Sequence, residues 1–451
     1  MGPTAGAFPS GDLDHPIARS DDVIHRETGI VKLLHVLCQQ PGNTGSGVFL
    51  QAIIHHASQA GHEQRAVIGI PASCSIEGLL PLDPENVFPV RFETESLPFP
   101  VAGMSDIMPY PSTRFSEFTE EMLEKYWTAF RNALNEAEQD GFQPDLIHSH
   151  HLWLVTALCR RMFEGTPLVV NCHSTEFRQM DRAPHLLDDV IPDCRRVDRV
   201  FALHDDQAAE ITARYGIESS RITIVGAGYR EDLFRPPEQA SCSCTESRTI
   251  EIVYAGKISR PKGVPFLIKA LGLVRVPQGY RVRVRLAGSS GGSSVDTIPK
   301  TIGRDDVTLE FLGMLNQKEL ADVFRSAHLL VLSSFYEGLP LVVVEALASG
   351  CRVVTTDLPS LGSWLPETLQ QEGIVERVPL PRLERMDEPH PEDIPTFVDR
   401  MARAIERQMN RIVAAPIDWE ACVRPCIGLW GWASVYRKME AEYLALRHRP
   451  S

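Results

Sequence analysis

The chain has 451 residues, of which 43% are hydrophobic and 23% are charged, so it can form two or three globular domains of roughly 100–200 residues each. Gly (31) and Pro (33) are close to ordinary usage and no apolar run approaches about 18 residues, which excludes collagen-like, wholly disordered and membrane-spanning proteins. The formal net charge of −14 lacks the basic excess of a nucleic-acid binder and opposes adsorption to an anionic membrane.

The ten cysteines are dispersed and form no pair of C-x-x-C motifs at the spacing of a zinc site. Several of them, such as Cys38 and Cys159, lie among apolar residues, where a free cysteine behaves as a small buried hydrophobic residue. No apolar signal segment opens the chain, so we expect a reducing, cytoplasmic setting, and peripheral association with a membrane stays open. Residues 1–29 are polar and lack periodicity, and we expect them to form a disordered tail.

The first half of the chain alternates short apolar runs with helix-like stretches. Residues 31–37 are apolar, residues 40–47 are rich in glycine, and a helical pattern then runs to Gly61. Further strands are expected at 146–148, 167–170, 199–203 and 221–225. Such alternation predicts a parallel sheet covered by helices on both faces. Four prolines within residues 97–112 exclude a regular element, so we expect a long ordered loop there, before a helix at 116–136.

A polar stretch at residues 236–248, which contains Cys242 and Cys244, marks the best domain boundary. A second α/β unit follows it, with strands expected at 250–255, 281–287, 308–312, 328–332 and 352–356. Residues 379–395 are proline-rich and acidic and are expected to form a surface insertion. Residues 418–446 have the pattern of a terminal helical segment.

An acidic motif lies between the last two of these strands. Pro340 suits the first turn of a helix and Gly350 its end, so residues 340–349 are expected to be helical despite three consecutive valines. Glu345 then lies in a nearly all-apolar helix, where a carboxylate needs hydrogen bonds from a ligand or from the backbone. Glu337 precedes the helix, and because helical side chains lean toward the N-terminus, both acids can contact one ligand. A solvated position for Glu337 and an internal ion pair for Glu345 stay open as structural alternatives.

The motif E-G-L-P followed by V-E-A-L-A-S-G, with its two glutamates eight residues apart, resembles the signature of the retaining glycosyltransferases of family 4. Residues 253–263 resemble the family's G-R-x-x-x-x-K-G loop, whose two cations hold the diphosphate of a nucleotide-sugar. Lys262 matches the second cation, and Lys257 stands where the family has arginine. A lysine cannot donate the two parallel hydrogen bonds of an arginine. Binding of the diphosphate is therefore expected to depend more on Lys262 and on the N-terminus of the following helix.

The glycine loop at residues 41–48 resembles the loop by which the family's first domain approaches the donor phosphates and the acceptor. The resemblance assigns this role to Gly45 and Gly47, where a Cβ would block close approach of the backbone. A dinucleotide site is the alternative, but Leu50 stands where G-x-G-x-x-G requires its third glycine.

Imidazoles follow two neighbouring strands. Residues 145–150 resemble the family's D-x-x-H-x-H segment, and residues 173–176 resemble its H-G-T-D segment, with serine and glutamate in place of glycine and aspartate. The resemblance places His150 near the transferred sugar and His173 at the sugar or the acceptor. His148 lies nearer the strand and suits a satisfied position in the core.

A metal is the alternative use of His148, His150 and His151, because imidazoles are common metal ligands. No acidic ligand is evident beside them, and the only D-x-D, at residues 12–14, lies in the expected tail. We therefore expect no metal and no cofactor.

The resemblance runs from about residue 31 to about residue 356 and implies the GT-B architecture, in which two Rossmann-like α/β domains with mostly parallel sheets face each other across a cleft. Residues 30–238 would bind the acceptor and residues 249–415 the nucleotide-sugar, while residues 416–451 would cross back to the first domain. The implied activity is a hexosyltransferase that retains anomeric configuration, with a UDP- or GDP-linked donor and a small soluble or lipid-linked hydroxyl acceptor. The implied catalytic residues are Glu337, His150, Lys262 and Lys257, and the donor site adds Gly45, Gly47, Gly338, Leu339 and Glu345.

Two other functions stay open. A nucleotide-sugar epimerase or a phosphorylase of the same fold would turn over the donor without a separate acceptor. A catalytically silent sugar-binding or scaffold protein would bind the ligand and leave it unchanged. An assay of donor hydrolysis and transfer separates these alternatives.

Overall fold

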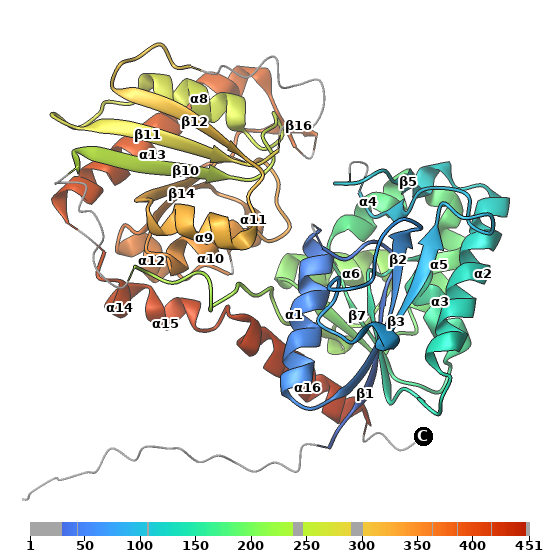
Figure 1. The fold of residues 1–451 in the computed structure, drawn as a ribbon. Coiled ribbons are helices and arrows are strands. Elements are labelled where there is room, and N and C mark those ends of the chain that lie inside the picture. The colour runs from blue at the N-terminus through green and yellow to red at the C-terminus, as the bar shows by residue number, and fades with distance from the viewer. Residues whose placement is uncertain are drawn as a thin grey trace, which may run out of the picture.

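The computed structural model describes residues 29–447 except 43, 106–107, 238–246, 290–300, 363, 386 and 416. Residues 1–28 of the expected tail, with its D-x-D motif, and the pair Cys242 and Cys244 lie outside the described residues. Two parallel sheets organise the chain, and helices cover both faces of each (Figure 1). The predicted fold class is therefore confirmed.

The first sheet has seven strands in the order β3-β2-β1-β6-β7-β8-β9, and every pair is parallel. Its strands are β1 (Lys32–Leu37), β2 (Glu63–Pro71), β3 (Val87–Phe92), β6 (Leu146–His150), β7 (Leu168–Asn171), β8 (Arg199–Ala202) and β9 (Ile222–Ile224). Strands β2 and β3 were not predicted from the sequence. The edge strand β3 contains Pro89 and Arg91, which hide the apolar pattern of a strand. Because the chain adds strands on one side of β1 and then on the other, the order reverses between β1 and β6.

Two helical layers bury this sheet. Its helices are α1 (Gly45–Gln59), α2 (Glu120–Ala137), α3 (Leu154–Met162), α4 (Thr175–Arg182), α5 (Leu187–Cys194) and α6 (Asp205–Tyr215). The expected loop at residues 97–112 contains one short strand, β4 (Ala102–Gly103), which pairs with β5 (Thr113–Arg114). The following helix begins at Glu120 rather than at residue 116, because the Thr119 hydroxyl accepts a hydrogen bond from the Met122 amide and caps it there.

The second sheet has six strands in the order β12-β11-β10-β13-β14-β15, again all parallel. They are β10 (Thr249–Ala255), β11 (Arg281–Ala287), β12 (Val307–Gly313), β13 (Leu329–Leu332), β14 (Arg352–Thr356) and β15 (Val375–Val378). Its helices are α8 (Val264–Leu273), α9 (Gln317–Arg325), α10 (Leu341–Ala348), α11 (Pro359–Gly362), α12 (Glu367–Gln371) and α13 (Ile394–Ala414). The order reverses here between β10 and β13. The expected insertion at 379–395 contains a small hairpin of β16 (Leu383–Arg385) and β17 (Glu388–Pro389).

The terminal segment belongs to both domains. Helices α14 (Trp419–Cys422) and α15 (Arg424–Ile427) pack on the second domain, whereas α16 (Trp432–Arg447) lies along α1 of the first (Figure 1). The chain thus crosses between the domains twice, and the two crossings touch. The Tyr229 amide donates to the Trp430 carbonyl at 3.1 Å, and the Trp432 amide donates to the Tyr229 carbonyl at 3.4 Å.

Helix α16 is anchored to the first sheet by polar contacts. Tyr443 hydrogen-bonds through its hydroxyl to Nδ1 of the buried His148 at 3.0 Å. Thr223 donates to Glu442 at 2.7 Å. Among the helices of the described residues, none is both long and apolar enough to cross a membrane.

We expect Tyr443→Phe to lower the free energy of unfolding by about 1–3 kcal/mol, because it leaves the buried Nδ1 of His148 without its hydroxyl partner. Tyr436→Phe is the matched control on the same helix, since the Tyr436 hydroxyl is buried and has no hydrogen-bond partner among the described residues. Removing it should leave stability unchanged or raised. Urea denaturation of both variants measures the difference, and equal effects would contradict the assigned role of the Tyr443 hydroxyl.

Candidate active site

The loops singled out in the sequence follow strands that flank the two reversal points, except that His173 follows β7 and Glu345 lies in α10 (Leu341–Ala348). Residues 256–263 follow β10 and residues 333–340 follow β13, on either side of the reversal in the second sheet. Residues 38–44 follow β1, and residues 151–153 follow β6, on either side of the reversal in the first sheet. Ligands of open α/β sheets bind at such points, because neighbouring loops diverge there and leave a crevice.

The loops after β10 and β13 are held together by their backbones. Gly263 has φ +72°, and a Cβ at this residue would lie 1.9 Å from the Ser333 carbonyl oxygen. The Ser333 hydroxyl in turn donates to the Lys262 carbonyl at 3.0 Å. Only glycine fits this approach, and it brings Lys262 against the loop that carries Glu337.

Lys262 and Glu337 form an ion pair, with 2.7 Å between Nζ and Oε2. The Lys262 ammonium also donates to the Tyr336 carbonyl at 3.2 Å. Their side chains are 29% and 20% exposed, so both remain within reach of a ligand. Lys257 is half-buried in the same loop, and its carbonyl accepts a hydrogen bond from the Tyr254 hydroxyl at 2.8 Å.

Glu345 lies in the middle of α10, which begins at Leu341 with Pro340 as its cap residue. Val343 and Val344 are fully buried, so packing outweighs their strand preference. The side chain of Glu345 has no ion pair within the part of the chain that the structure describes, so the alternative of an internal ion pair is not found there. Burial raises the pKa of Glu345 to about 7.

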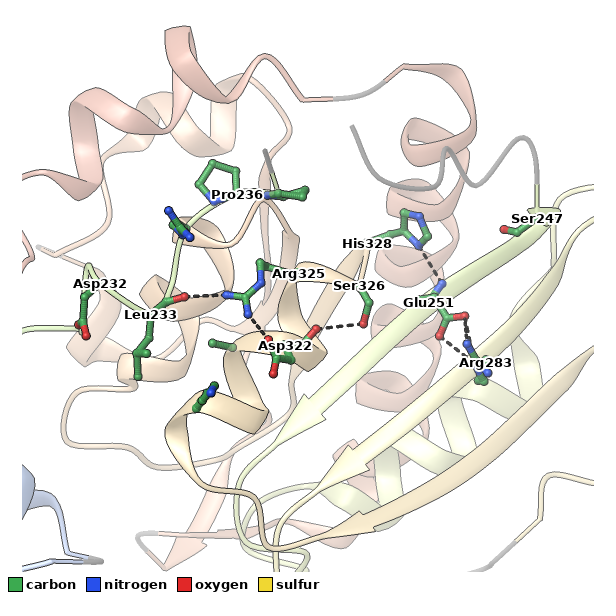
Figure 2. Close-up of a pocket in the computed structure, with 14 residues that line it drawn as sticks. Asp232, Leu233, Pro236, Ser247, Glu251, Arg283, Asp322, Arg325, Ser326 and His328 are labelled. Atoms are coloured by element: carbon green, nitrogen blue, oxygen red, sulfur yellow. Dashed lines mark hydrogen bonds and ion pairs between the residues drawn. The ribbon is translucent and has the colours of Figure 1, made fainter. Parts of the chain in front are cut away.

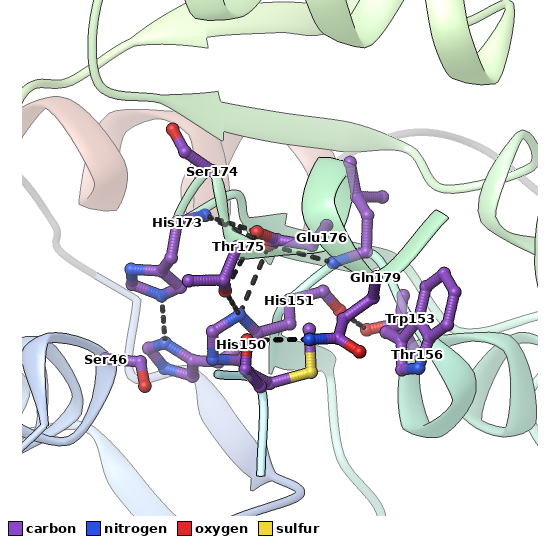
Figure 3. A network of polar contacts seen from close by, with 12 residues as sticks. Ser46, His150, His151, Trp153, Thr156, His173, Ser174, Thr175, Glu176 and Gln179 are labelled. Atoms are coloured by element: carbon purple, nitrogen blue, oxygen red, sulfur yellow. Dashed lines mark hydrogen bonds and ion pairs between the residues drawn. The ribbon is translucent and has the colours of Figure 1, made fainter. Parts of the chain in front are cut away.

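The imidazoles of His148, His150, His151 and His173 form a contiguous cluster, which we call the imidazole cluster. Figure 3 shows three of them, His150, His151 and His173. Both ring nitrogens of His148 have partners, Asn171 at 2.6 Å and Tyr443 at 3.0 Å, as a core histidine requires. His150 contacts His173 through its Nδ1 at 3.2 Å, and its buried Nε2 has no partner in the described chain. Burial lowers the pKa of His173 to about 3 and that of His150 well below its usual value, so both rings are neutral at pH 7.

Glu176 holds the two loops of the imidazole cluster together. Its carboxylate accepts hydrogen bonds from the amides of His173 at 3.0 Å and Leu152 at 3.3 Å, and it pairs with His151 at 3.3 Å (Figure 3). Burial raises the pKa of Glu176, but His151, His173 and the backbone donor outweigh it and lower the pKa to about 2. The loops bend sharply here, since His151 and Ser174 have φ +70° and +67°.

Within the described ranges, no group of three or more His, Cys, Asp or Glu side chains is arranged to hold a metal ion.

The glycine loop at residues 41–48 follows β1, in the same domain as the imidazole cluster. Thr44 caps α1 by accepting from the Gly47 amide at 3.1 Å, and a Cβ at Gly47 would lie 2.6 Å from the Gly42 nitrogen. Gly45 is exposed and has open space beside it. Gln39 ties this loop to the long loop at 97–112, because it donates to the Ser46 hydroxyl at 2.8 Å and accepts from the Met104 amide at 3.0 Å.

The loop that carries Glu337 lies against the first domain. A Cβ at Gly338 would lie 3.8 Å from the Ser174 hydroxyl, and Leu339 packs against the apolar cluster that contains Phe49.

A hollow of about 980 Å³ lies at the other end of the second domain, where β10 and β11 begin (Figure 2). Two of its arginines are paired within the protein. Arg283 donates to Glu251 at 2.7 Å, and Arg325 donates to the Leu233 carbonyl at 2.8 Å. This hollow contains none of the site residues that the sequence analysis proposed.

Two family models match the chain. The model described as "Glycosyl transferase 4-like domain" matches residues 44–228, and the model described as "Glycosyl transferases group 1" matches residues 249–377. A curated relative, D-inositol 3-phosphate glycosyltransferase 2 of Catenulispora acidiphila, is 29% identical over 252 residues, which are 51% of this chain and 58% of the relative. The chain thus spans little more than half the length of that relative.

Solved structures share the fold. A glycosyltransferase from Rickettsia africae aligns with a TM-score of 0.63 at 12% identity, covering 94% of this chain and 100% of that one. Anabaena HepE in complex with UDP and glucose aligns with a TM-score of 0.58 at 15% identity, covering 92% and 99%.

The raised pKa of Glu345 predicts a pH-dependent stability. Glu345 is neutral in both states below about pH 4.5, and the fold is progressively penalised as pH rises to about 7, where the buried carboxylate ionises. Glu345→Gln stays neutral at every pH and avoids this penalty. The stability of the variant minus that of the wild type should therefore increase by about 3 kcal/mol between about pH 4.5 and a pH above 7. Urea denaturation of both proteins across this range measures the effect. A stability difference that is the same at both ends would mean that burial does not raise the pKa of Glu345.

Proposed function

The chain belongs to the group 1 glycosyltransferases of family 4 and has the GT-B fold, and from this premise we propose that it moves a hexose from a nucleotide-diphosphate sugar to a hydroxyl acceptor with retention of anomeric configuration. The observation that carries the proposal is the Lys262–Glu337 pair at the reversal point of the second sheet, in a loop whose Leu339 packs against the first domain.

Lys262 and Lys257 are proposed to neutralise the diphosphate. When the bond between the anomeric carbon and the phosphate oxygen breaks, negative charge grows on the leaving group, and a fixed cation stabilises it. Lys262 is already held beside Glu337 by the close approach at Gly263, so it needs no reorganisation. The amides of Gly338 and Leu339 are proposed to bind the sugar and the phosphate, and Glu337 to accept hydrogen bonds from the sugar hydroxyls.

Glu345 is proposed to bind the ribose. A buried carboxylate without a partner is costly, and two ribose hydroxyls would donate the hydrogen bonds that it lacks among the described residues. The donor is proposed to be linked to UDP or GDP, and the likeness to a structure that contains UDP and glucose supports the first.

His150 and His173 are proposed to orient the transferred sugar and the acceptor beside Gly45 and Gly47. Both imidazoles are neutral, and the buried Nε2 of His150 has no hydrogen-bond partner among the described residues. The acceptor oxygen would attack the anomeric carbon on the face that the phosphate leaves, and the departing phosphate oxygen would take the hydroxyl proton. The protein then contributes positioning and charge stabilisation.

A donor screen tests the proposed function directly. Thermal shift against UDP-, GDP- and ADP-sugars identifies the nucleotide by stabilisation of the folded state. Transfer to hydroxyl acceptors with the matching donor, followed by NMR of the product, then gives the anomeric configuration. Inversion would contradict the proposal, and turnover of the donor without any acceptor would favour an epimerase or a phosphorylase. Binding without turnover would favour a scaffold protein.

Glu337→Ala should lower the transfer rate by about 100-fold while calorimetric binding of the nucleoside diphosphate is retained or tightened, because the variant frees Lys262 from its ion pair. Lys262→Ala is the matched comparison and should raise the donor KM and lower kcat together, since it removes charge that the leaving group needs. Unchanged turnover in Glu337→Ala would remove Glu337 from the sugar site.

We expect transfer to survive EDTA, because two lysines are proposed to supply the charge that a metal would supply. The measurement is the transfer rate before and after chelation, with readdition of Mn²⁺ or Zn²⁺ as the control. Loss in EDTA and recovery with either cation would assign the imidazole cluster to a metal.

A further inference from the structure

One residue of the long loop at 97–112 is held by side chains from two other elements. Met104 directly follows β4 and is 1% exposed, and both of its backbone polar groups bond to glutamine side chains. Its amide donates to Oε1 of Gln39 at 3.0 Å, and its carbonyl accepts from Nε2 of Gln179 at 3.0 Å. Gln39 and Gln179 are each 3% exposed, so water does not compete for either contact.

Gln39 joins Met104 to the glycine loop. It lies shortly after β1, and its Nε2 donates to the hydroxyl of Ser46 at 2.8 Å. Ser46 stands between Gly45 and Gly47 in the first turn of α1. Because the Met104 amide can only donate, it fixes the orientation of the Gln39 side-chain amide and turns the Nε2 toward Ser46. The two contacts of Gln39 are therefore made together.

Gln179 joins Met104 to the imidazole cluster. It lies on α4, whose first turn carries Glu176, the residue that holds the two loops of the cluster together (Figure 3). On the side of the glycine loop, Phe49 of α1 contacts the ring of His173 edge-on, with 5.5 Å between the ring centroids. Met104 is thus fixed to both of the elements that are proposed to surround the acceptor.

Other contacts of the long loop fix it to itself. Strand β4 pairs with β5, the Thr113 amide donates to the Val101 carbonyl at 3.1 Å, and the Thr113 hydroxyl donates to the Pro100 carbonyl at 2.8 Å. These hydrogen bonds set the shape of the loop at its base. The contacts of Gln39 and Gln179, by contrast, set where the loop lies relative to the glycine loop and α4.

We propose that Gln39 is a positioning residue for acceptor binding: it holds Met104 against the glycine loop, so that residues 97–105 form the side of the acceptor site next to the imidazole cluster. The role rests on the proposed function, since it concerns the acceptor of the same reaction. Gln39 touches no reacting atom in this role and acts through the segment that it holds. Its loss should therefore weaken acceptor binding and leave the donor site intact.

Gln39→Met tests this role, because methionine is similar in length and volume but replaces neither hydrogen bond. The assay uses UDP-glucose, or the nucleotide-sugar that the donor screen selects, with the acceptor that the wild type glycosylates. We expect the acceptor KM to rise about three- to tenfold, the worth of one hydrogen bond, while the donor KM and the hydrolysis of the donor by water stay at the wild-type level. Gln179→Met should also raise the acceptor KM, since it releases the other side of Met104.

Gln51→Met is the matched control. Gln51 also lies on α1, is half-buried and donates to a loop carbonyl, that of Leu79, at 3.2 Å. That loop carries none of the proposed site residues, so the acceptor KM of Gln51→Met should equal that of the wild type.

Amide hydrogen exchange of the full chain provides a readout that needs no activity. The Met104 amide loses its acceptor in Gln39→Met and should exchange about tenfold faster than in the wild type, whereas Gln51→Met should leave its exchange unchanged.

A wild-type acceptor KM in both Gln39→Met and Gln179→Met, or an equal rise in Gln51→Met, would overturn the proposal. Unchanged exchange of the Met104 amide in Gln39→Met would overturn it as well, and so would a loss of donor hydrolysis that matches the loss of transfer. If the wild type transfers no sugar, the proposed function fails, whereas faster exchange in Gln39→Met shows that the hold of Gln39 on Met104 stands.

Discussion

The second domain depends on one close approach of two backbones. The Ser333 carbonyl occupies the space where any residue other than glycine at position 263 would place its Cβ. Because of that approach, the loops after β10 and β13 meet, and Lys262 and Glu337 can pair although they are far apart in the sequence. In the first domain, the loops after β6 and β7 are held together by a charged group. The ionised Glu176 accepts hydrogen bonds from both loops.

Much of the architecture could be predicted from local pattern. Apolar runs such as those of β10 and β14 are buried on both faces, so their sequences signal strands without ambiguity. Parallel order then implies that the loops after successive strands share one edge, which brings the motif residues to the same side of each sheet. The edge strand β3 escaped prediction because Pro89 and Arg91, tolerated only where one side is unpaired, interrupt its pattern.

The relations between distant segments could not be predicted. Nothing in the sequence around Glu337 indicates that its charge meets Lys262. The partner of His148 is Tyr443, near the other end of the chain. Such contacts are set by the placement of whole helices, whereas sequence pattern reports the environment of one residue at a time.

The path of the chain has a consequence for its synthesis on the ribosome. The apolar face of α1, with Phe49 and Ile53, is covered by α16, and more than 200 residues separate the end of β9 at Ile224 from Trp432. At about 5–20 residues per second, that face stays open for roughly 10–40 seconds while the second domain emerges and folds. The domain made first is therefore the domain completed last, and chaperones that bind apolar surface have their longest access to it during that interval.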